Sequence, residues 1–322
     1  MNPSHAAVPA KLHATADTPY QEALAQGWLP IREVARQTGV NAVTLRAWER
    51  RYGLVVPQRT AKGHRLYTPS HVQRIHTILT WLARGVAVSQ VKQLLDAPAQ
   101  LVDQQAENDW QPLRRALLQA ISELAERKLD ETINRVMALY PPTTLFEHLL
   151  HPLLRDLEQR WQGQFGAQME RTFFVSWLRS KFGARIYHNN RQLSGEPLLL
   201  VNQSDLVMEP QLWLMAWLIS SADCPVEVFD WPLPAGELAL AIERLGARAV
   251  VLYSSRALNL AGLPRLLQGC DCDKLIVGPA VLIHRNELQA YSETIDRLYL
   301  VDEPLAAHRR LQQQGLLQGY TP

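Results

Sequence analysis

Cysteine is scarce in this chain of 322 residues, with only Cys224, Cys270 and Cys272, all in the last third. So few thiols exclude a disulfide framework as the basis of the fold. Long apolar runs are also absent, because the longest, Leu212–Ile219, is far shorter than the roughly 20 residues that span a bilayer. The first 27 residues lack the apolar segment of a secretory signal. We therefore expect a cytoplasmic protein that does not associate with membranes.

Acidic residues are almost missing from the segment Trp28–Leu95, which holds eleven Lys and Arg residues against two Asp and Glu residues. The whole chain has a net charge of only +2, so the remaining residues are acidic on balance. A composition of 47% hydrophobic and 20% charged residues is that of a globular protein. The asymmetry predicts a polyanionic partner for the basic segment alone.

The basic segment has the signals of a small helical module with a hairpin. Asn41 is a good N-cap for a helix that Gly53 ends, and Pro57 begins an extended hairpin with its turn at Lys62-Gly63. Further helices are expected over residues 29–39, 69–85 and 89–95, where apolar residues recur at helical spacing. We place this module at residues 28–96, after a flexible leader at residues 1–27.

Cationic side chains gather on the helix and on the hairpin, an arrangement that suits a strip of phosphates with base edges between them. Arg46 has the reach for bidentate contacts to guanine, and Thr44 stands where it could bond a phosphate from the first helical turn. Trp48 offers an indole N–H to a phosphate, and the hairpin cations position the duplex without reading it. The predicted DNA-binding residues are Thr44, Arg46, Trp48, Arg50, Arg51, Arg59, Lys62, His64, Arg65 and Tyr67.

These residues resemble the MerR family of transcriptional regulators. The resemblance implies a winged helix-turn-helix that binds double-stranded promoter DNA, with residues 41–52 in the major groove and the hairpin as the wing. It also implies a homodimer that spans two half-sites, and a distortion of the promoter that lets RNA polymerase engage. The matching positions are Thr44-Leu45-Arg46, Trp48-Glu49, Tyr52-Gly53-Leu54, Pro57, Arg59, Gly63-His64-Arg65 and Tyr67.

The rest of the chain predicts two further domains. Residues 97–109 are expected to be a linker. Residues 110–195 show helical spacing in about four segments separated near Lys128, at Pro141-Pro142 and near Gly163–Gly166, which is typical of a helix bundle. In residues 196–322, five short apolar runs alternate with helical stretches, which predicts a doubly wound, flavodoxin-like α/β domain with a five-stranded parallel sheet. The expected fold class is therefore multidomain.

A head of this type followed by a bundle and an α/β domain resembles the MlrA-like branch of the family, whose α/β domain is cobalamin-binding-like. The resemblance extends to light-sensing repressors, which hold cobalamin through an Asp/Glu-x-His-x-x-Gly motif after the first strand of that domain, with the His as the cobalt ligand. Here the loop after Leu198–Val201 reads NQSDLVMEPQLW and holds no histidine. None of the ten histidines has Asp or Glu two positions earlier, so the motif is absent from the chain.

Weaker signals of the same cofactor site remain. Ser254 resembles a serine of the cobalamin fold, and Gly278 stands where a glycine pair would flank the nucleotide tail. Trp161, Glu170 and Arg171 resemble a Trp followed by Glu-His, with Arg171 in place of the His. We therefore expect no cofactor, and an α/β domain that serves as a regulatory, effector or dimerisation module. A cobalamin-dependent light- or ligand-sensing repressor is the alternative.

Two smaller clusters invite a metal-binding interpretation. Cys270 and Cys272 could grip a soft ion, but a solvated loop is the favoured interpretation. His148 and His151 lie three residues apart without an evident third ligand, which favours a surface or interface pair. No Gly-rich phosphate loop, nucleophile elbow or zinc signature occurs, so the sequence predicts a regulator of transcription and not an enzyme.

Overall fold

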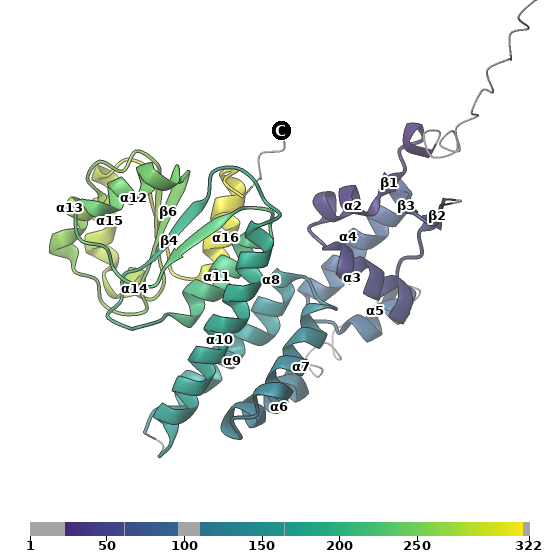
Figure 1. The fold of residues 1–322 in the computed structure, drawn as a ribbon, viewed down its shortest axis with the longest axis horizontal. Coiled ribbons are helices and arrows are strands. Elements are labelled where there is room, and N and C mark those ends of the chain that lie inside the picture. The colour runs from purple at the N-terminus through teal and green to yellow at the C-terminus, as the bar shows by residue number, and fades with distance from the viewer. Residues whose placement is uncertain (1–22, 61, 96–109, 164, 318–322) are drawn as a thin grey trace, which may run out of the picture. The chain divides into compact units, whose positions relative to one another are not determined.

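The structure is a computed structural model that describes residues 23–60, 62–95, 110–163 and 165–317. The chain divides into two compact units, Met1–Val102 and Asp103–Pro322, which are treated separately below (Figure 1). The expected linker at residues 97–109 and most of the expected leader lie outside the described residues. The last residues of that leader form a helical turn, in which the Trp28 N–H donates to the Ala23 carbonyl at 2.9 Å.

The first unit is a helical head with a small antiparallel sheet of strand order β1-β3-β2. The prediction starts the first helix at Leu29, but Leu29 and Pro30 instead form a strand that pairs with the wing, Leu29 opposite Tyr67. Proline after Leu29 favours an extended backbone there and then begins the helix. The elements are β1 (Leu29–Pro30), α2 (Ile31–Thr38), α3 (Ala42–Ala47), the π-helix η1 (Trp48–Tyr52), β2 (Gln58–Arg59), β3 (Arg65–Tyr67), α4 (Pro69–Ala83) and α5 (Val88–Leu95).

Local signals fix the helix ends of the head, at Asn41 and Gly53 as the sequence predicts. The Asn41 side chain accepts a hydrogen bond from the Thr44 N–H at 2.9 Å and caps α3. Gly53 ends the helix in the left-handed conformation, with φ 58°. Thr68 and His71 form a reciprocal capping box at the start of α4. The core between these helices is apolar and at most 1% exposed at Val34, Leu45, Trp48, Ile75, Ile78 and Leu82.

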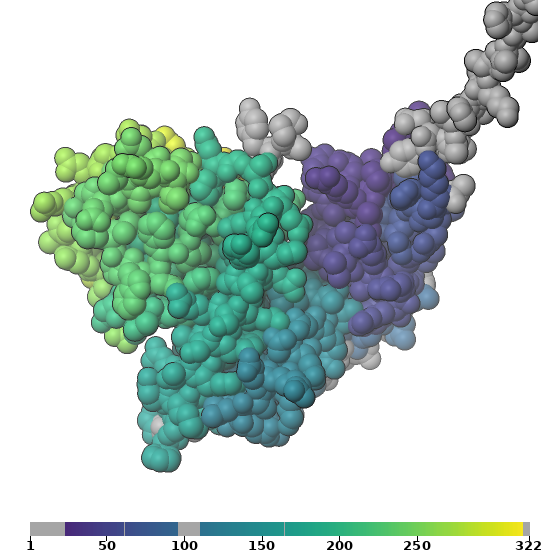
Figure 2. All heavy atoms as spheres, in the orientation of Figure 1, coloured from purple at the N-terminus to yellow at the C-terminus, as the bar shows by residue number. Residues whose placement is uncertain are grey.

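The second unit begins with the helix bundle. The break predicted near Lys128 is present four residues earlier, at Leu124, which has φ 51°, and Lys128 itself lies inside α7. The predicted break at Pro141-Pro142 is confirmed, and the helices α8, η2 and α9 then follow one another without a loop. The elements are α6 (Trp110–Ser122), α7 (Glu126–Met137), α8 (Pro142–Leu145), the π-helix η2 (Phe146–Leu150), α9 (His151–Arg160) and α10 (Ala167–Asn190). The end of the bundle where α9 passes into α10 projects at the lower edge of Figure 2.

The α/β domain contains the five predicted strands, all parallel, in the order β5-β4-β6-β7-β8. The strands are β4 (Leu198–Asn202), β5 (Val226–Phe229), β6 (Ala249–Tyr253), β7 (Asp273–Val277) and β8 (Leu298–Val301). The helices are α11 (Pro210–Ser220), α12 (Glu237–Leu245), the short η3 (Leu260–Gly262), α13 (Leu263–Leu267), α14 (Ala280–Ile283), α15 (Arg285–Thr294) and α16 (Pro304–Gln313). The doubly wound architecture is therefore confirmed, and the strand order reverses between β4 and β6.

Helices cover both faces of this sheet (Figure 1). Every residue of β4 and β6 is buried, as expected for central strands covered on both sides. On one face, Leu199 and Leu252 belong to a core cluster with Leu238 of α12, Leu263 of α13 and Leu288 of α15. Helices α11 and α16 pack together on the other face.

Helix α10 attaches the bundle to the α/β domain. The rings of Phe182 and Trp217 meet edge to face, with centroids 5.2 Å apart. The side chain of Asn190 donates to the Val226 carbonyl at 2.7 Å and accepts from the Val226 N–H at 3.2 Å, so it pairs with the start of β5 as a neighbouring strand would. These contacts explain why bundle and sheet form one compact unit. In the described part of the chain, no helix is both long and apolar enough to cross a membrane.

The buried His308 of α16 predicts an acid-sensitive second unit. Its side chain is 7% exposed, and burial lowers its pKa from 6.5 to about 4, with a further contribution from Arg309. Between these pH values the unfolded chain binds the proton and the folded chain does not, so stability is full above about pH 6.5 and falls towards pH 4. From pH 7 to pH 4.5 the loss assigned to this residue is on the order of 2 kcal/mol.

Urea denaturation followed by tryptophan fluorescence at both pH values measures that loss. His308→Leu should reduce the difference between the two free energies of unfolding. His188→Leu, at an exposed histidine of α10, is the matched control and should retain the parent's difference. Equal pH dependence in the parent and in His308→Leu would contradict the assignment.

Candidate functional site

Three arginines of the α3–η1 helix face solvent. Arg46, Arg50 and Arg51 are exposed, and none has an ion-pair partner among the residues that the structure describes. A guanidinium without a carboxylate partner keeps its charge and its hydrogen-bond donors for an external anion. Lys62 and His64, at the turn of the wing, are exposed as well. The wing turn itself is confirmed at Gly63, whose φ is 82°.

Trp48 is not part of this surface. We call α3 and η1 together the recognition helix, because the π-helix continues α3 without a break at Trp48. The helix ends at Gly53, whose N–H donates to the Glu49 carbonyl at 3.2 Å. The indole of Trp48 is 0% exposed and is the largest fully buried side chain among the described residues. The predicted phosphate contact of Trp48 is therefore wrong, because the side chain that the prediction turns outward forms the centre of the head.

Thr44 and Tyr67 need the same correction. Thr44 is 0% exposed and Tyr67 is 1% exposed. Neither hydroxyl has a hydrogen-bond partner within the described residues. Burial, with a smaller effect of the Glu49 carboxylate, raises the pKa of Tyr67 to about 12. Side chains in these positions pack the head together and have no access to a phosphate.

Glu49 organises the wing, although it is not among the predicted DNA-binding residues. Its carboxylate accepts from Arg59 Nη2 at 2.8 Å and, through the other oxygen, from Arg65 Nε. Arg59 and Arg65 lie directly opposite each other on β2 and β3. Burial raises the pKa of Glu49, but the hydrogen bonds from Arg65 and Arg59 outweigh it and the net shift is downward. The signal was present, since Glu49 is one of two acidic residues in the basic segment.

The ion pairs divide the roles of the two wing arginines. The Arg65 side chain is only 18% exposed and is held against Glu49, which corrects its predicted role as a phosphate contact to that of an anchor between helix and wing. The Arg59 side chain is 50% exposed, so it can contact an external anion while Glu49 orients it. Because Glu49 joins both strands of the wing to η1, the hairpin is fixed relative to the recognition helix.

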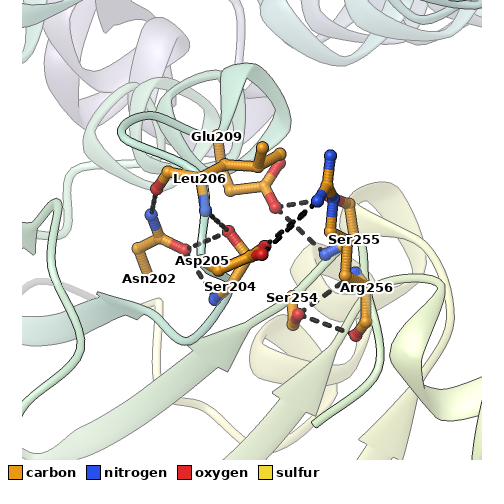
Figure 3. A network of polar contacts seen from close by, with 8 residues as sticks. All are labelled: Asn202, Ser204, Asp205, Leu206, Glu209, Ser254, Ser255 and Arg256. Atoms are coloured by element: carbon orange, nitrogen blue, oxygen red, sulfur yellow. Dashed lines mark hydrogen bonds and ion pairs between the residues drawn. The ribbon is translucent and has the colours of Figure 1, made fainter.

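The second candidate region lies at the carboxyl ends of β4 and β6, where the strand order reverses and α/β proteins bind their ligands. Figure 3 shows that the loop after β4 is closed by its own hydrogen bonds. The buried Asn202 side chain donates to the Leu206 carbonyl at 2.8 Å and accepts from the Ser204 hydroxyl at 2.8 Å. The Ser204 hydroxyl in turn accepts from the Leu206 N–H at 3.2 Å.

Two acidic side chains tie this loop to the loop after β6 (Figure 3). Glu209, which is 3% exposed, accepts from the Ser255 hydroxyl at 2.6 Å and from the Ser255 N–H at 3.1 Å. Asp205 forms an exposed ion pair with Arg256 at 3.3 Å. The two loops therefore brace each other and satisfy most of the polar groups drawn in the figure.

Ser254 and Gly278, two of the predicted cofactor residues, have structural roles beside these loops. The buried Ser254 hydroxyl donates to the Arg256 carbonyl at 2.8 Å. Gly278 has φ 109°, and a Cβ at this position would lie 2.5 Å from the Ser254 carbonyl oxygen. Only glycine allows the loop after β7 to approach the Ser254 carbonyl so closely. The space beside Gly278 is thus occupied by the chain itself.

The predicted bundle residues Trp161 and Glu170 are brought together, but Arg171 is not part of their cluster. Glu170 accepts from the Trp161 indole N–H at 3.3 Å and from two nitrogens of Arg160, each at 3.0 Å. Sequence reasoning missed Arg160, which neutralises Glu170. Arg171 acts on Glu158 instead, where it opposes the rise in pKa that burial and the Glu209 carboxylate cause.

The smaller clusters do not form metal sites within the described residues, where no group of three potential ligands occurs. Cys270 and Cys272 are buried, at 6% and 7% exposed, so the predicted solvated loop is wrong. The carbonyls of both cysteines accept from Lys274 Nζ, at 2.8 and 2.9 Å. The ring of His148 stacks on Trp110 with centroids 5.6 Å apart.

Comparison with known proteins places this geometry in a family. A model of MerR HTH family regulatory proteins matches residues 29–98, and a model of the B12 binding domain matches residues 113–186. The HTH-type transcriptional regulator MlrA of Escherichia coli (strain K12) is 34% identical over 198 residues, which cover 62% of this chain and 78% of that protein. The chain belongs to the MerR family of transcriptional regulators. It is a DNA-binding regulator of the MlrA-like branch, as the sequence predicts.

Other similarities are more limited. The HTH-type transcriptional repressor CarH of Myxococcus xanthus is 31% identical over 167 residues, which cover 47% of this chain and 56% of CarH. A cobalamin-binding protein of Desulfitobacterium hafniense shares 14% identity over 62% of this chain and 97% of its own, with a TM-score of 0.33, which is too low to argue from. The B12-binding match lies within the bundle, from α6 to α10, and does not extend into the α/β domain.

The α/β crevice of this MerR-family chain does not fit a cobalamin held through a histidine. The loop from Asn202 to Glu209 offers no imidazole. The side chains of Asn202, Ser204, Asp205 and Glu209 are engaged with this loop and with the loop after β6. The buried amide nitrogen of Gln203 has no hydrogen-bond partner among the described residues. The close approach at Gly278 is taken by the Ser254 carbonyl. The bundle retains a Trp161–Glu170 pair, which belongs to the part of the chain that matches the B12-binding family.

The burial of Thr44 predicts that its hydroxyl contributes nothing to DNA binding. Thr44→Val replaces a buried hydroxyl that has no partner among the described residues with a methyl group of similar size. The free energy of unfolding should stay equal or rise, by up to about 1–2 kcal/mol, since an unpaired buried polar group is costly. Guanidinium denaturation and fluorescence-anisotropy titration of a DNA duplex measure the two quantities. If Thr44→Val lost DNA affinity without losing stability, the hydroxyl of Thr44 would have a role in DNA binding, contrary to this prediction.

Proposed function

We propose that this MerR-family regulator binds a pseudo-palindromic promoter site as a cytoplasmic homodimer, and that it does so without cobalamin. The observation that carries the proposal is the set of exposed arginines Arg46, Arg50 and Arg51 on a helix that Asn41 caps. They lie in a segment with eleven basic and two acidic residues. One of those acidic residues, Glu49, forms ion pairs with Arg59 and Arg65 of the wing. This head therefore offers strong positive charge to the backbone of a duplex.

The proposed interface is smaller than the sequence suggests. Arg46 enters the major groove with the first turns of the recognition helix, where its guanidinium can contact guanine or a phosphate. The other members bind phosphates and hold the register of the protein on the duplex. The proposed DNA contacts are Arg46, Arg50, Arg51, Arg59, Lys62 and His64.

The dimer and the promoter distortion follow from the geometry of a duplex. One head covers one half-site, and two heads on one side of the duplex reach half-sites about 34–36 Å apart. Bending or untwisting a promoter of that length costs on the order of 1–6 kcal/mol, which a second set of phosphate contacts can offset. RNA polymerase then engages the distorted promoter. No side-chain constellation of the described residues supports an enzymatic role in addition.

A cobalamin-dependent light- or ligand-sensing repressor is the second candidate function. The match of the bundle to the B12 binding domain and the Trp161–Glu170 pair favour it. The closed loop after β4 and the occupied space at Gly278 favour the first proposal. In that proposal the second unit is a regulatory, effector or dimerisation module that has kept the architecture without this ligand.

Arg46→Ala should separate sequence reading from general attraction to DNA. We expect the variant to lose about 1–3 kcal/mol of binding free energy at a duplex selected from a random library and to bind a scrambled duplex nearly as the parent does.

Lys62→Ala should lower the affinity for both duplexes alike and lower the slope of log K against log salt by about one unit. Fluorescence anisotropy at four salt concentrations measures both. If Arg46→Ala bound both duplexes as the parent does, the proposed placement of α3 in the major groove would be contradicted.

Cobalamin itself provides the fourth test. Purified protein mixed with adenosylcobalamin in the dark and then desalted should show no cobalamin absorbance in the visible spectrum. Its affinity for the selected duplex should be the same without the vitamin, with it, and after illumination. A coloured complex that survives desalting would contradict the cobalamin-independent proposal and support the second candidate, while the DNA-binding proposal would stand.

A further inference from the structure

Val43 is an exposed apolar side chain on a helix whose other outward residues are charged. Its exposed fraction is 59%, whereas Leu45 and Ala47 of the same helix are 1% and 6% exposed. A single exposed apolar residue is ordinary on a protein surface. Its place on the recognition helix is what gives it meaning here, because the same helix carries Arg46 three residues further on.

In the first turn of α3, the side chain of Val43 is exposed and the side chain of Thr44 is buried. The Asn41 cap, with its 2.9 Å hydrogen bond to the Thr44 N–H, fixes where the helix starts. Thr44 then faces the core at 0% exposed, so the polar side chain predicted to contact DNA from this turn is absent from the surface. In helix-turn-helix proteins the N-terminal residues of the recognition helix face the base edges. Val43 is the second residue of α3 and occupies that position.

Valine can read only one feature of the major groove. It has no hydrogen-bond donor or acceptor on its side chain, and the 5-methyl group of thymine is the apolar group that base pairs display there. A β-branched side chain in a helix holds essentially one rotamer, so its two methyl groups are fixed before binding. We propose that Val43 determines specificity by contacting the 5-methyl group of one thymine in each half-site. This inference rests on the proposed placement of α3 in the major groove.

The test uses a duplex selected from a random library by the full-length protein. Each thymine in one half-site is replaced in turn by deoxyuridine, which forms the same base pair without the methyl group. Burying one methylene-sized group contributes about 0.8 kcal/mol, so one replacement should weaken binding of the parent by about 4-fold. Val43→Ala should bind the thymine and deoxyuridine duplexes with less than about a 2-fold difference, because both γ-methyl groups are gone.

Two further variants control for trivial effects. Val56→Ala changes a valine that is 62% exposed and lies outside α3, and it should keep the parent's 4-fold response to deoxyuridine. Val43→Thr keeps one γ-methyl group and should show an intermediate response. Circular dichroism of each variant checks that the head remains folded, which the exposure of both valines leads us to expect.

The outcomes separate the two proposals. The inference is overturned if no thymine responds in the parent, if the selected site lacks thymine at every position that the protein requires, or if Val43→Ala keeps the full response. In each of these cases sequence-specific binding would still have been demonstrated by the selection. A selection that enriches no sequence would instead end the proposed function, and the inference with it.

Discussion

The geometry of the head depends on the two ion pairs that the Glu49 carboxylate forms with Arg59 and Arg65. Arg59 and Arg65 face each other across an antiparallel pair, an arrangement that like charges destabilise. Glu49, whose side chain is 11% exposed, bonds both and removes the repulsion. The residue before it, Trp48, is buried in the core. One turn of π-helix thus fastens the recognition helix to the interior on one side and to the wing on the other.

Much of the fold could be predicted because its elements carry strong local signals. The five strands of the α/β domain are short apolar runs bounded by breakers, and Asn41 and Gly53 are side chains that favour helix ends. The failures come where the signal is too short or too ambiguous. Strand β1 has two residues, which is too short for an alternation of apolar and polar residues to be recognised. The turn at Leu124 has a left-handed backbone conformation, which leucine does not favour and which the sequence therefore does not predict.

The candidate DNA-binding residues were partly mispredicted for a different reason. A family motif marks positions that matter without saying whether they matter for the fold or for the ligand. In this chain the two uses alternate along one helix: Thr44 and Trp48 are buried, and Arg46 and Arg50 are exposed. Apolar spacing along this helix assigns Trp48 to its buried side, in agreement with the structure, although it wrongly assigns Val43 there as well. The phosphate contact predicted for Trp48 comes from the family resemblance. The burial of Thr44 depends on tertiary packing around a capped first turn, which the sequence pattern does not encode.

The same distinction applies to Ser254 and Gly278, which resemble residues of a cofactor site. Glycine at position 278 allows the loop after β7 to approach the Ser254 carbonyl, and the Ser254 hydroxyl holds the Arg256 carbonyl in the loop after β6. Both residues therefore have structural roles that do not depend on a bound ligand. The cobalt ligand has no such second role, because a histidine on the loop after β4 is not needed to close it. Asn202, through hydrogen bonds to the Leu206 and Asp230 carbonyls, performs that closure here. The structural roles of Ser254 and Gly278 are thus independent of a cobalt ligand, so the presence of these two residues does not by itself indicate cobalamin binding.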